Sequence, residues 1–201
     1  NISQSGDIIL MNKLKELRKK IADDKSIPPY VIFQDPSLNE MTFRYPTSTD
    51  ELSSIFGVGE GKAKKYGKDF IELIAKHVEE NNIDRPDDMV VKSAGKNSSL
   101  KLFIIQGIDR KLSIEDIAQS KSMQVEELIS EMETIVYSGT KLDLSYCIDD
   151  YLDEDQQDEL YDYFIESESD DIEQALTEFH GEYDEFELKL FRIKFLSDLA
   201  N

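Results

Sequence analysis

The stretch from Glu51 to His77 constrains the fold more than any other part of the sequence. It predicts a short helix, a glycine-rich turn and a long helix, because apolar residues recur at three- and four-residue intervals on both sides of the turn. The apolar face of the first helix comprises Leu52, Ile55 and Phe56. The stripe along the second comprises Ala63, Tyr66, Gly67, Phe70, Ile71 and Ile74. A helical hairpin is therefore expected here.

Lysines and glycines of this hairpin form a candidate nucleic-acid site. The candidate residues are Gly57, Gly59, Lys62, Lys64, Lys65 and Lys68. A glycine turn permits positive φ and leaves N–H groups at a helix start, where an anion can bind. Lysines attract phosphate regardless of sequence. The same pattern also fits a tight corner beside a solvated lysine face that contacts no ligand. A nucleotide phosphate loop is excluded, because Phe56 replaces its first glycine and Ala63 its Ser or Thr.

Residues 14–77 resemble the helicase-and-RNase-D C-terminal (HRDC) domain, as found at the end of RecQ-family DNA helicases. The resemblance rests on LKELRKKIADD, PPYVIFQDPSLNEM and ELSSIFGVGEGKAKKYGKDFIELI, which follow the family's order and spacing. It implies a compact helical bundle that binds DNA weakly or docks partners, without catalysis. In that family an aromatic at the place of Tyr30 can face DNA and stack on an unpaired base. An aromatic after two prolines also suits the core, so both interpretations of Tyr30 stay open.

Charge is distributed unevenly along the chain. Net charge is −20 over 201 residues, but residues 1–80 contribute only −1 of it and residues 81–201 contribute −19. Residues 82–98 are rich in Asn, Asp, Ser, Gly and Pro and fit a linker. We therefore predict an all-α protein with an HRDC-like bundle over residues 1–81, a linker over 82–98 and an acidic helical domain over 99–201.

The acidic part begins with a helix-turn-helix pattern. The run from Leu112 to Leu144 is similar to the helix-turn-helix module of some bacterial RecQ helicases, and residues 140–144 fit a short extended wing. The third helix of the pattern, over 125–137, carries four glutamates and no Lys or Arg. A DNA reader presents cations or amides to base edges, and carboxylates repel phosphate. This helix is therefore interpreted as a packing or protein-docking element.

The rest of the chain gives fewer signals. No Lys or Arg lies between Lys141 and Lys189, and a final helix near residues 186–200 is apolar around most of its circumference. Such a helix is buried in its own domain or against a partner. Cys147 is expected to be a buried small hydrophobe, and His77 and His180 to be surface or capping residues. An EF-hand over the acidic run is excluded, because Asp158 stands where glycine is required.

The resemblance implies an accessory C-terminal region of a RecQ-like DNA helicase that supports unwinding in repair and recombination. The expected partners are single-stranded or forked DNA for the first domain, and the parent's own motor domains or a basic protein for the acidic domain. The fragment has no Walker or motor motif, so it should hold no cofactor, and ATP and Mg²⁺ are expected only in motor domains outside this sequence. No membrane partner is expected, and the expected location is the bacterial cytoplasm, near the nucleoid.

Two alternatives remain open at this point. The chain fits a purely protein-binding regulatory fragment whose lysine face never contacts DNA. It also fits the accessory tail of an RNase D-like ribonuclease, which carries the same kind of domain. The sequence begins with Asn1 rather than Met, which favours a piece of a longer protein.

Overall fold

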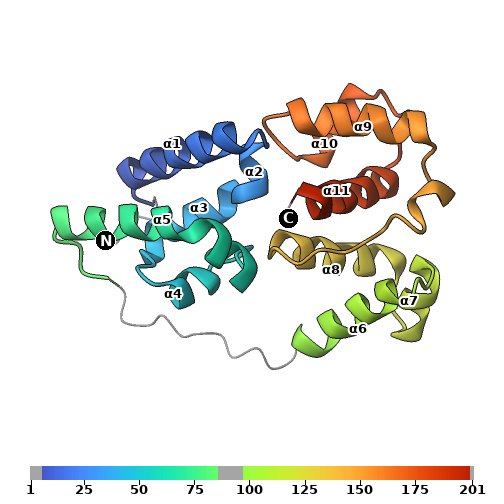
Figure 1. Ribbon diagram of the computed structural model, residues 1–201, viewed down its shortest axis with the longest axis horizontal. Helices are drawn as coiled ribbons and strands as arrows, with labels where there is room; N and C mark the ends of the chain where they lie inside the picture. Colours follow the sequence, from blue (N-terminus) through green and yellow to red (C-terminus); the bar gives the residue numbers. More distant parts are fainter. Residues whose placement is uncertain (1–5, 86–96, 200–201) are drawn as a thin grey trace. The chain divides into compact units, whose positions relative to one another are not determined.

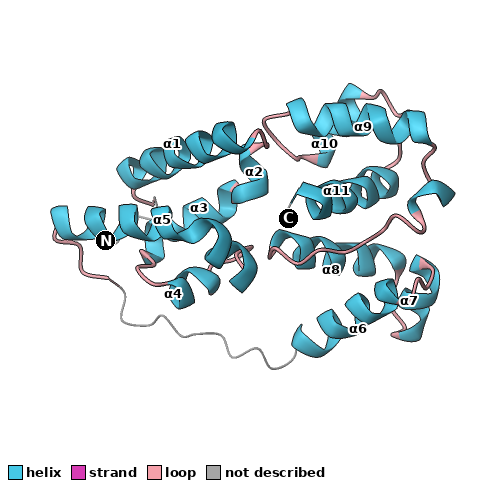
Figure 2. Cartoon of the chain, in the orientation of Figure 1, coloured by secondary structure: helices cyan, strands magenta, loops and turns pink. Residues whose placement is uncertain are grey.

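The computed structural model describes residues 6–85 and 97–199, and all regular elements in these ranges are helices (Figures 1 and 2). This confirms the predicted all-α class. The chain divides into two compact units, Asn1–Ser93 and Ala94–Asn201. Most of the predicted linker, residues 86–96, lies outside the described residues.

The first unit is a bundle built around its longest helix. Its helices are α1 (Ile8–Lys25), α2 (Pro29–Ile32), α3 (Asp35–Arg44), α4 (Thr49–Ser53) and α5 (Glu60–Glu80). Helix α1 packs against α2, α3 and α5, and α4 packs against α5. In the core, the ring of Phe33 meets Phe70 edge to face at 4.9 Å between centroids, and Tyr66 at 6.4 Å. Such aromatic pairs combine a large buried area with a preferred geometry, which fixes how α5 packs on the segment after α2.

Polar residues define the helix starts in this unit. Asp7 caps α1, because its carboxylate accepts the N–H of Leu10 at 2.9 Å. Pro29 occupies the first position of α2, as expected for a residue without an N–H. Ser48 caps α4, because its hydroxyl accepts the N–H of Glu51 at 3.2 Å.

The second unit consists of a helix-turn-helix followed by two acidic helices and a final helix in which acidic and basic residues balance. Its elements are α6 (Asn97–Asp109), α7 (Ile114–Ser120), α8 (Val125–Tyr137), the 3₁₀ turn η1 (Ile148–Asp150), α9 (Glu154–Glu166), α10 (Ile172–Glu178) and α11 (Glu185–Leu199). Helix α11 packs against α8, α9 and α10 and is thus the central helix (Figure 1). Its buried apolar residues are Leu188, Leu190, Phe191, Ile193, Phe195 and Leu196. The apolar circumference predicted from the sequence is therefore covered within the unit itself.

One local expectation for this unit, the extended wing, was wrong. Residues 140–144 form no strand, and the N–H of Leu142 donates instead to Ser197 Oγ on α11 at 3.1 Å. The predicted wing is therefore an irregular segment that packs on the central helix. Helix α6 also continues through Gly107, where a Cβ would come within 2.9 Å of Ile117. Gly107 thus allows α7 to approach α6 closely and does not interrupt the helix.

A buried ion cluster joins α8 to α11. Arg192 on α11 pairs with Glu133 on α8, and these side chains are 11% and 14% exposed. Arg192 also donates to the backbone oxygen of Asp170, whose carboxylate accepts the hydroxyl of Tyr137. The cluster places one of the few cations of this unit in a structural role. The surface of the unit accordingly remains strongly acidic.

Candidate nucleic-acid interface

The turn between α4 and α5 is held rigidly by α3. Ser37 Oγ donates to the backbone oxygen of Phe56 at 2.7 Å, and the Phe56 N–H donates to Glu40 at 2.9 Å. Gly57 follows with φ of +72°, and a Cβ there would lie 2.9 Å from Ser37 Oγ. Only glycine adopts this conformation without strain while leaving room for the Ser37 hydrogen bond. The predicted turn role of Gly57 therefore has a specific structural basis.

Gly59 has a different role from Gly57. It is the N-cap of α5 with φ of −93° and ψ of 173°, a conformation open to any residue, and no side chain caps the helix there. The close approach of the two helices occurs about two turns later, at Gly67, whose Cβ would meet Leu52 Cδ2 at 2.5 Å. Glycine at position 67 thus lets α4 pack directly on α5.

A groove runs between the start of α4 and the exposed side of α5. It has a volume of about 540 Å³. Its lining residues are Thr47, Ser48, Thr49, Ala63, Lys64, Lys68, Ile71 and Glu72. Two ammonium groups and three hydroxyls therefore converge on one open surface. Lysine and Ser/Thr side chains are the common donors to phosphate oxygens in nucleic-acid complexes.

The electrostatic strength of this groove is modest. Lys64 Nζ lies 3.5 Å from Glu60, but both side chains are more than two-thirds exposed, so the pair contributes little and can exchange for a phosphate. Glu72 opposes the two lysines within the groove. Nearby, Arg85 donates to Thr47 Oγ1 at 2.5 Å and pairs with Glu51 at 2.6 Å. The arrangement suits weak contacts to a nucleic-acid backbone rather than tight binding.

A second cationic position lies at the other side of α5. Lys25, in the last turn of α1, and Lys65 both approach the ring of Tyr66, with Nζ to centroid distances of 6.0 and 5.3 Å. Burial, and then the positive charge of Lys25, lower the pKa of Lys65 below its ordinary value. Two like charges held on adjacent helices raise the local affinity for an anion. Lys65 thus belongs to a different cationic position from Lys64 and Lys68.

Two of the predicted site residues are not available at the surface. Lys62 is 4% exposed, because its position in the first turn of α5 faces the bundle instead of the outer lysine face. Tyr30 is also 4% exposed, so its ring offers no open face on which a base could stack. The core interpretation of Tyr30 agrees with the structure, and the base-stacking interpretation does not.

Phe56 was assigned to the apolar face of α4 in the sequence pattern, but it is 65% exposed. Its backbone is fixed on both sides by α3, so the ring projects from a rigid turn. An exposed aromatic ring is a surface on which an unpaired base can stack. One sequence signal points to this exposure. Phe56 directly precedes the turn glycine Gly57, and α4 has already ended at Ser53, so the helical spacing no longer determines where the ring points.

Helix α8 of the second unit presents carboxylates where a groove-reading helix presents cations. Glu126 and Glu127 are exposed, and Glu127 forms a capping box with Gln124 at the start of the helix. Glu133 is engaged with Arg192. This distribution fits the packing or docking interpretation of the helix and gives no basis for reading DNA bases.

Two models of known domain families match parts of this chain. The family model for the HRDC domain matches residues 9–74, and the model for the RecQ-1-like helix-turn-helix domain matches residues 98–148. The chain contains an HRDC domain and a RecQ-1-like helix-turn-helix domain. The matched stretches correspond to the bundle of α1–α5 and to the helices that start the acidic unit. The resemblances inferred from the sequence are therefore confirmed.

Relatives of the HRDC-containing chain include several DNA helicases. It is 46% identical over 65 residues to the ATP-dependent DNA helicase RecQ of Bacillus subtilis, and 46% identical over 68 residues to that of Haemophilus influenzae. It is 34% identical over 65 residues to the ATP-dependent DNA helicase UvrD2 of Mycobacterium tuberculosis. These alignments cover 32–34% of this chain and 9–11% of the relatives. The chain thus spans about a tenth of the length of the helicases that it matches.

Two other kinds of site are absent from the part of the chain that the structure describes. No helix in residues 6–85 and 97–199 is long and apolar enough to cross a membrane. Within the same ranges, no three His, Cys, Asp or Glu side chains come together in a way that could hold a metal ion. Cys147 is buried, as the sequence predicted.

Proposed function

We propose that this chain is an accessory region of a RecQ-like DNA helicase, in which the HRDC domain binds single-stranded or forked DNA weakly. The groove with Lys64, Lys68 and three hydroxyls supports this proposal most directly. Its lysines contact phosphates, and the exposed ring of Phe56 offers a place for an unpaired base. ATP and Mg²⁺ would act in motor domains outside this sequence, and the domain described here would help them to hold and select substrates in repair and recombination.

The test is binding of a fluorescent oligothymidine by the whole chain, followed by anisotropy. We expect a dissociation constant on the order of 10⁻⁵ M or weaker, the range of non-specific electrostatic binding. The double variant Lys64→Glu, Lys68→Glu should lose measurable binding. Lys76→Glu is the matched control, because Lys76 is equally exposed on α5, pairs with Glu80 and lies outside the groove. Equal loss in all variants, or none in the double variant, would contradict the proposed groove.

The acidic unit has a separate proposed role, which is docking on a basic protein surface. Residues 142–188 contain 19 Asp and Glu and no Lys or Arg, which favours attraction to cationic surfaces and repulsion of DNA. Such long-range attraction is screened within about 8 Å at physiological salt. Removing residues 99–201 from the parent helicase should therefore raise DNA affinity most at low salt, if the unit competes with DNA. Unchanged affinity at every salt concentration would exclude that competition.

A further inference from the structure

A pocket of about 350 Å³ opens between the N-terminal ends of α8 and α11. Its lining residues are Glu126, Ile129, Ser130, Asp184, Glu185, Phe186 and Lys189. The two helices run in the same direction, because Glu126 shares the pocket with Glu185 and Glu133 pairs with Arg192 farther along both helices. Two helix starts therefore frame one opening at the surface of the acidic unit.

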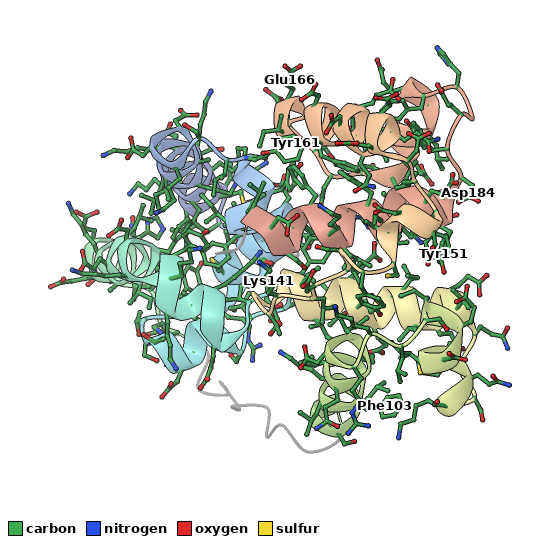
Figure 3. The ribbon with its side chains drawn as sticks, turned by 45° about the vertical axis from the view of Figure 1, so that its right-hand side comes forward. Phe103, Lys141, Tyr151, Tyr161, Glu166 and Asp184 are labelled. Carbon is green, nitrogen blue, oxygen red and sulfur yellow. The ribbon has the colours of Figure 1, made fainter. Side chains whose placement is uncertain are left out.

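The inner wall of the pocket is apolar and firmly held. Ile129 is 2% exposed, and Phe186 meets the ring of Tyr151 at 5.2 Å in an edge-to-face contact. Tyr151 in turn donates its hydroxyl to Glu115 at 3.0 Å. Figure 3 shows Tyr151 and Asp184 at the same edge of the unit. Phe186 thus presents a fixed aromatic ring in a pocket that is also lined by carboxylates.

The rim of the pocket carries three carboxylates and one ammonium group. Lys189 pairs with Glu185 at 2.6 Å, and Asp184 accepts the N–H of Glu187 at 2.9 Å as a helix cap. Glu126 is exposed, and among the described residues no side chain pairs with its carboxylate. An excess of negative charge therefore remains at the mouth of an apolar pocket.

We propose that this pocket receives an arginine side chain from a basic segment of a partner protein. The inference rests on the docking role proposed above and names its point of contact. The planar guanidinium of arginine stacks on an aromatic ring and bonds a carboxylate with two parallel N–H groups, which the ammonium of lysine does not match. Phe186 and Glu126 offer this pair of partners in one pocket. The volume fits one side chain, and the rim repels phosphate.

The test uses the whole chain and three short fluorescent peptides that alternate glycine with arginine, lysine or uncharged citrulline. Glu126→Gln removes the open carboxylate, and Phe186→Ala removes the ring. Each should weaken binding of the arginine peptide by about two- to fivefold, as measured for exposed ion pairs and cation–π contacts. Phe186→Ala should also remove the preference for arginine over lysine. The matched control is Glu154→Gln, an exposed glutamate in the first turn of α9 that lies outside the pocket.

The outcomes separate this inference from the proposal on which it rests. If Glu126→Gln and Glu154→Gln weaken binding equally, docking occurs through diffuse charge and the pocket is not the contact. If the arginine and lysine peptides bind no better than the citrulline peptide, the docking role itself is wrong. Glu126 is exposed and is not the capping residue of α8, so its variant should fold even if Phe186→Ala does not. Tighter binding of a second copy of the chain than of the peptide would also overturn the inference.

Discussion

His77 Nε2 lies 2.7 Å from Asp7 Oδ2, although 70 residues separate them in the sequence. His77 was expected at the surface or at a cap, but it is 2% exposed. Its Nδ1 faces the nitrogens of Lys13 and Asn81, at 3.4 and 3.3 Å. Both groups only donate, so Nδ1 accepts and Nε2 carries the proton that it donates to Asp7. One imidazole thus connects the first turn of α1 with the last turns of α5.

This connection predicts an acid-sensitive contribution to the stability of the first unit. Partial burial acts to raise the pKa of the Asp7 carboxyl, but hydrogen bonds from the Leu10 N–H and from His77 outweigh it and hold the pKa below its ordinary value of 3.8. The stabilisation is therefore present above pH 3.8 and is lost as pH falls through the folded-state pKa. Thermal melts of Asp7→Asn and the parent should differ at neutral pH and converge in acid. The exposed Asp24→Asn should show no such convergence.

Gly57 and Gly59 should respond oppositely to substitution. Gly57→Ala places a Cβ against Ser37 at positive φ and should destabilise the first unit by about 1–3 kcal/mol. Gly59→Ser should be neutral or stabilise by a few tenths of a kcal/mol, because its conformation suits any residue and serine caps a helix better than glycine. Urea denaturation followed by far-UV circular dichroism measures both. If both substitutions lowered the free energy of unfolding by similar amounts, glycine would be required throughout the turn and not at Gly57 alone.

Arg192→Met should destabilise the acidic unit by up to about 3 kcal/mol, because it leaves the largely buried Glu133 carboxylate without its partner. Adding Glu133→Leu should recover much of the loss, since a buried ion pair can be replaced by apolar side chains at little cost. The control is Lys194→Met on the same helix, whose pair with Asp198 is more exposed and contributes about 0.5 kcal/mol or less. Equal effects of Arg192→Met and Lys194→Met in denaturation curves would contradict this assignment.

Phe56→Ala should weaken binding of single-stranded DNA and leave duplex binding unchanged, because only an unpaired base can stack on the exposed ring. The expected loss is up to about 1–3 kcal/mol per stacked base. Phe43→Ala is the matched control, since Phe43 is a partly exposed aromatic on α3. If Phe43→Ala and Phe56→Ala reduced binding equally, general surface apolarity and not stacking would explain the loss.

Salt dependence gives an independent measure of the lysine contacts. Each phosphate contact with a single strand contributes about 0.7 to the slope of log K against log salt. Replacing Lys64 and Lys68 by alanine should therefore lower that slope by about 1.4. Replacing Lys76 should leave it unchanged, since Lys76 lies outside the groove. A constant slope in the double variant would mean that other cations hold the strand.

Periodic apolar stripes predicted most of the helices correctly. The stripe on α5 places Phe70 and Ile74 fully in the core, and the apolar residues of α8 and α11 are buried as expected. Helical periodicity reports which side of a helix is apolar, and burial follows directly from it. The glycine turn was also located correctly, because glycine is strongly preferred at positions with positive φ.

Features that depend on three-dimensional neighbours were not predictable. Lys62 and His77 are polar residues that are buried in the first unit, and His77 meets Asp7 from the other end of the bundle sequence. The sequence does not distinguish Asp171, which caps α10, from its neighbour Asp170, because adjacent Asp residues have equal capping capacity. The prediction of a wing was wrong because a short alternation of polar and apolar residues is the same in a strand and in an irregular segment that packs on α11.

The central position of α11 has a consequence for how the acidic unit is made in the cell. Helices α8, α9 and α10 all pack against residues that are synthesised after them. A nascent chain that ends before Glu185 lacks the surface on which these helices are buried, so it exposes their apolar faces. Because translation adds about 5–20 residues per second, this exposure lasts for seconds. The core cluster of the first unit lies within residues 10–74, so this unit can fold on the ribosome before α11 of the second unit has been synthesised.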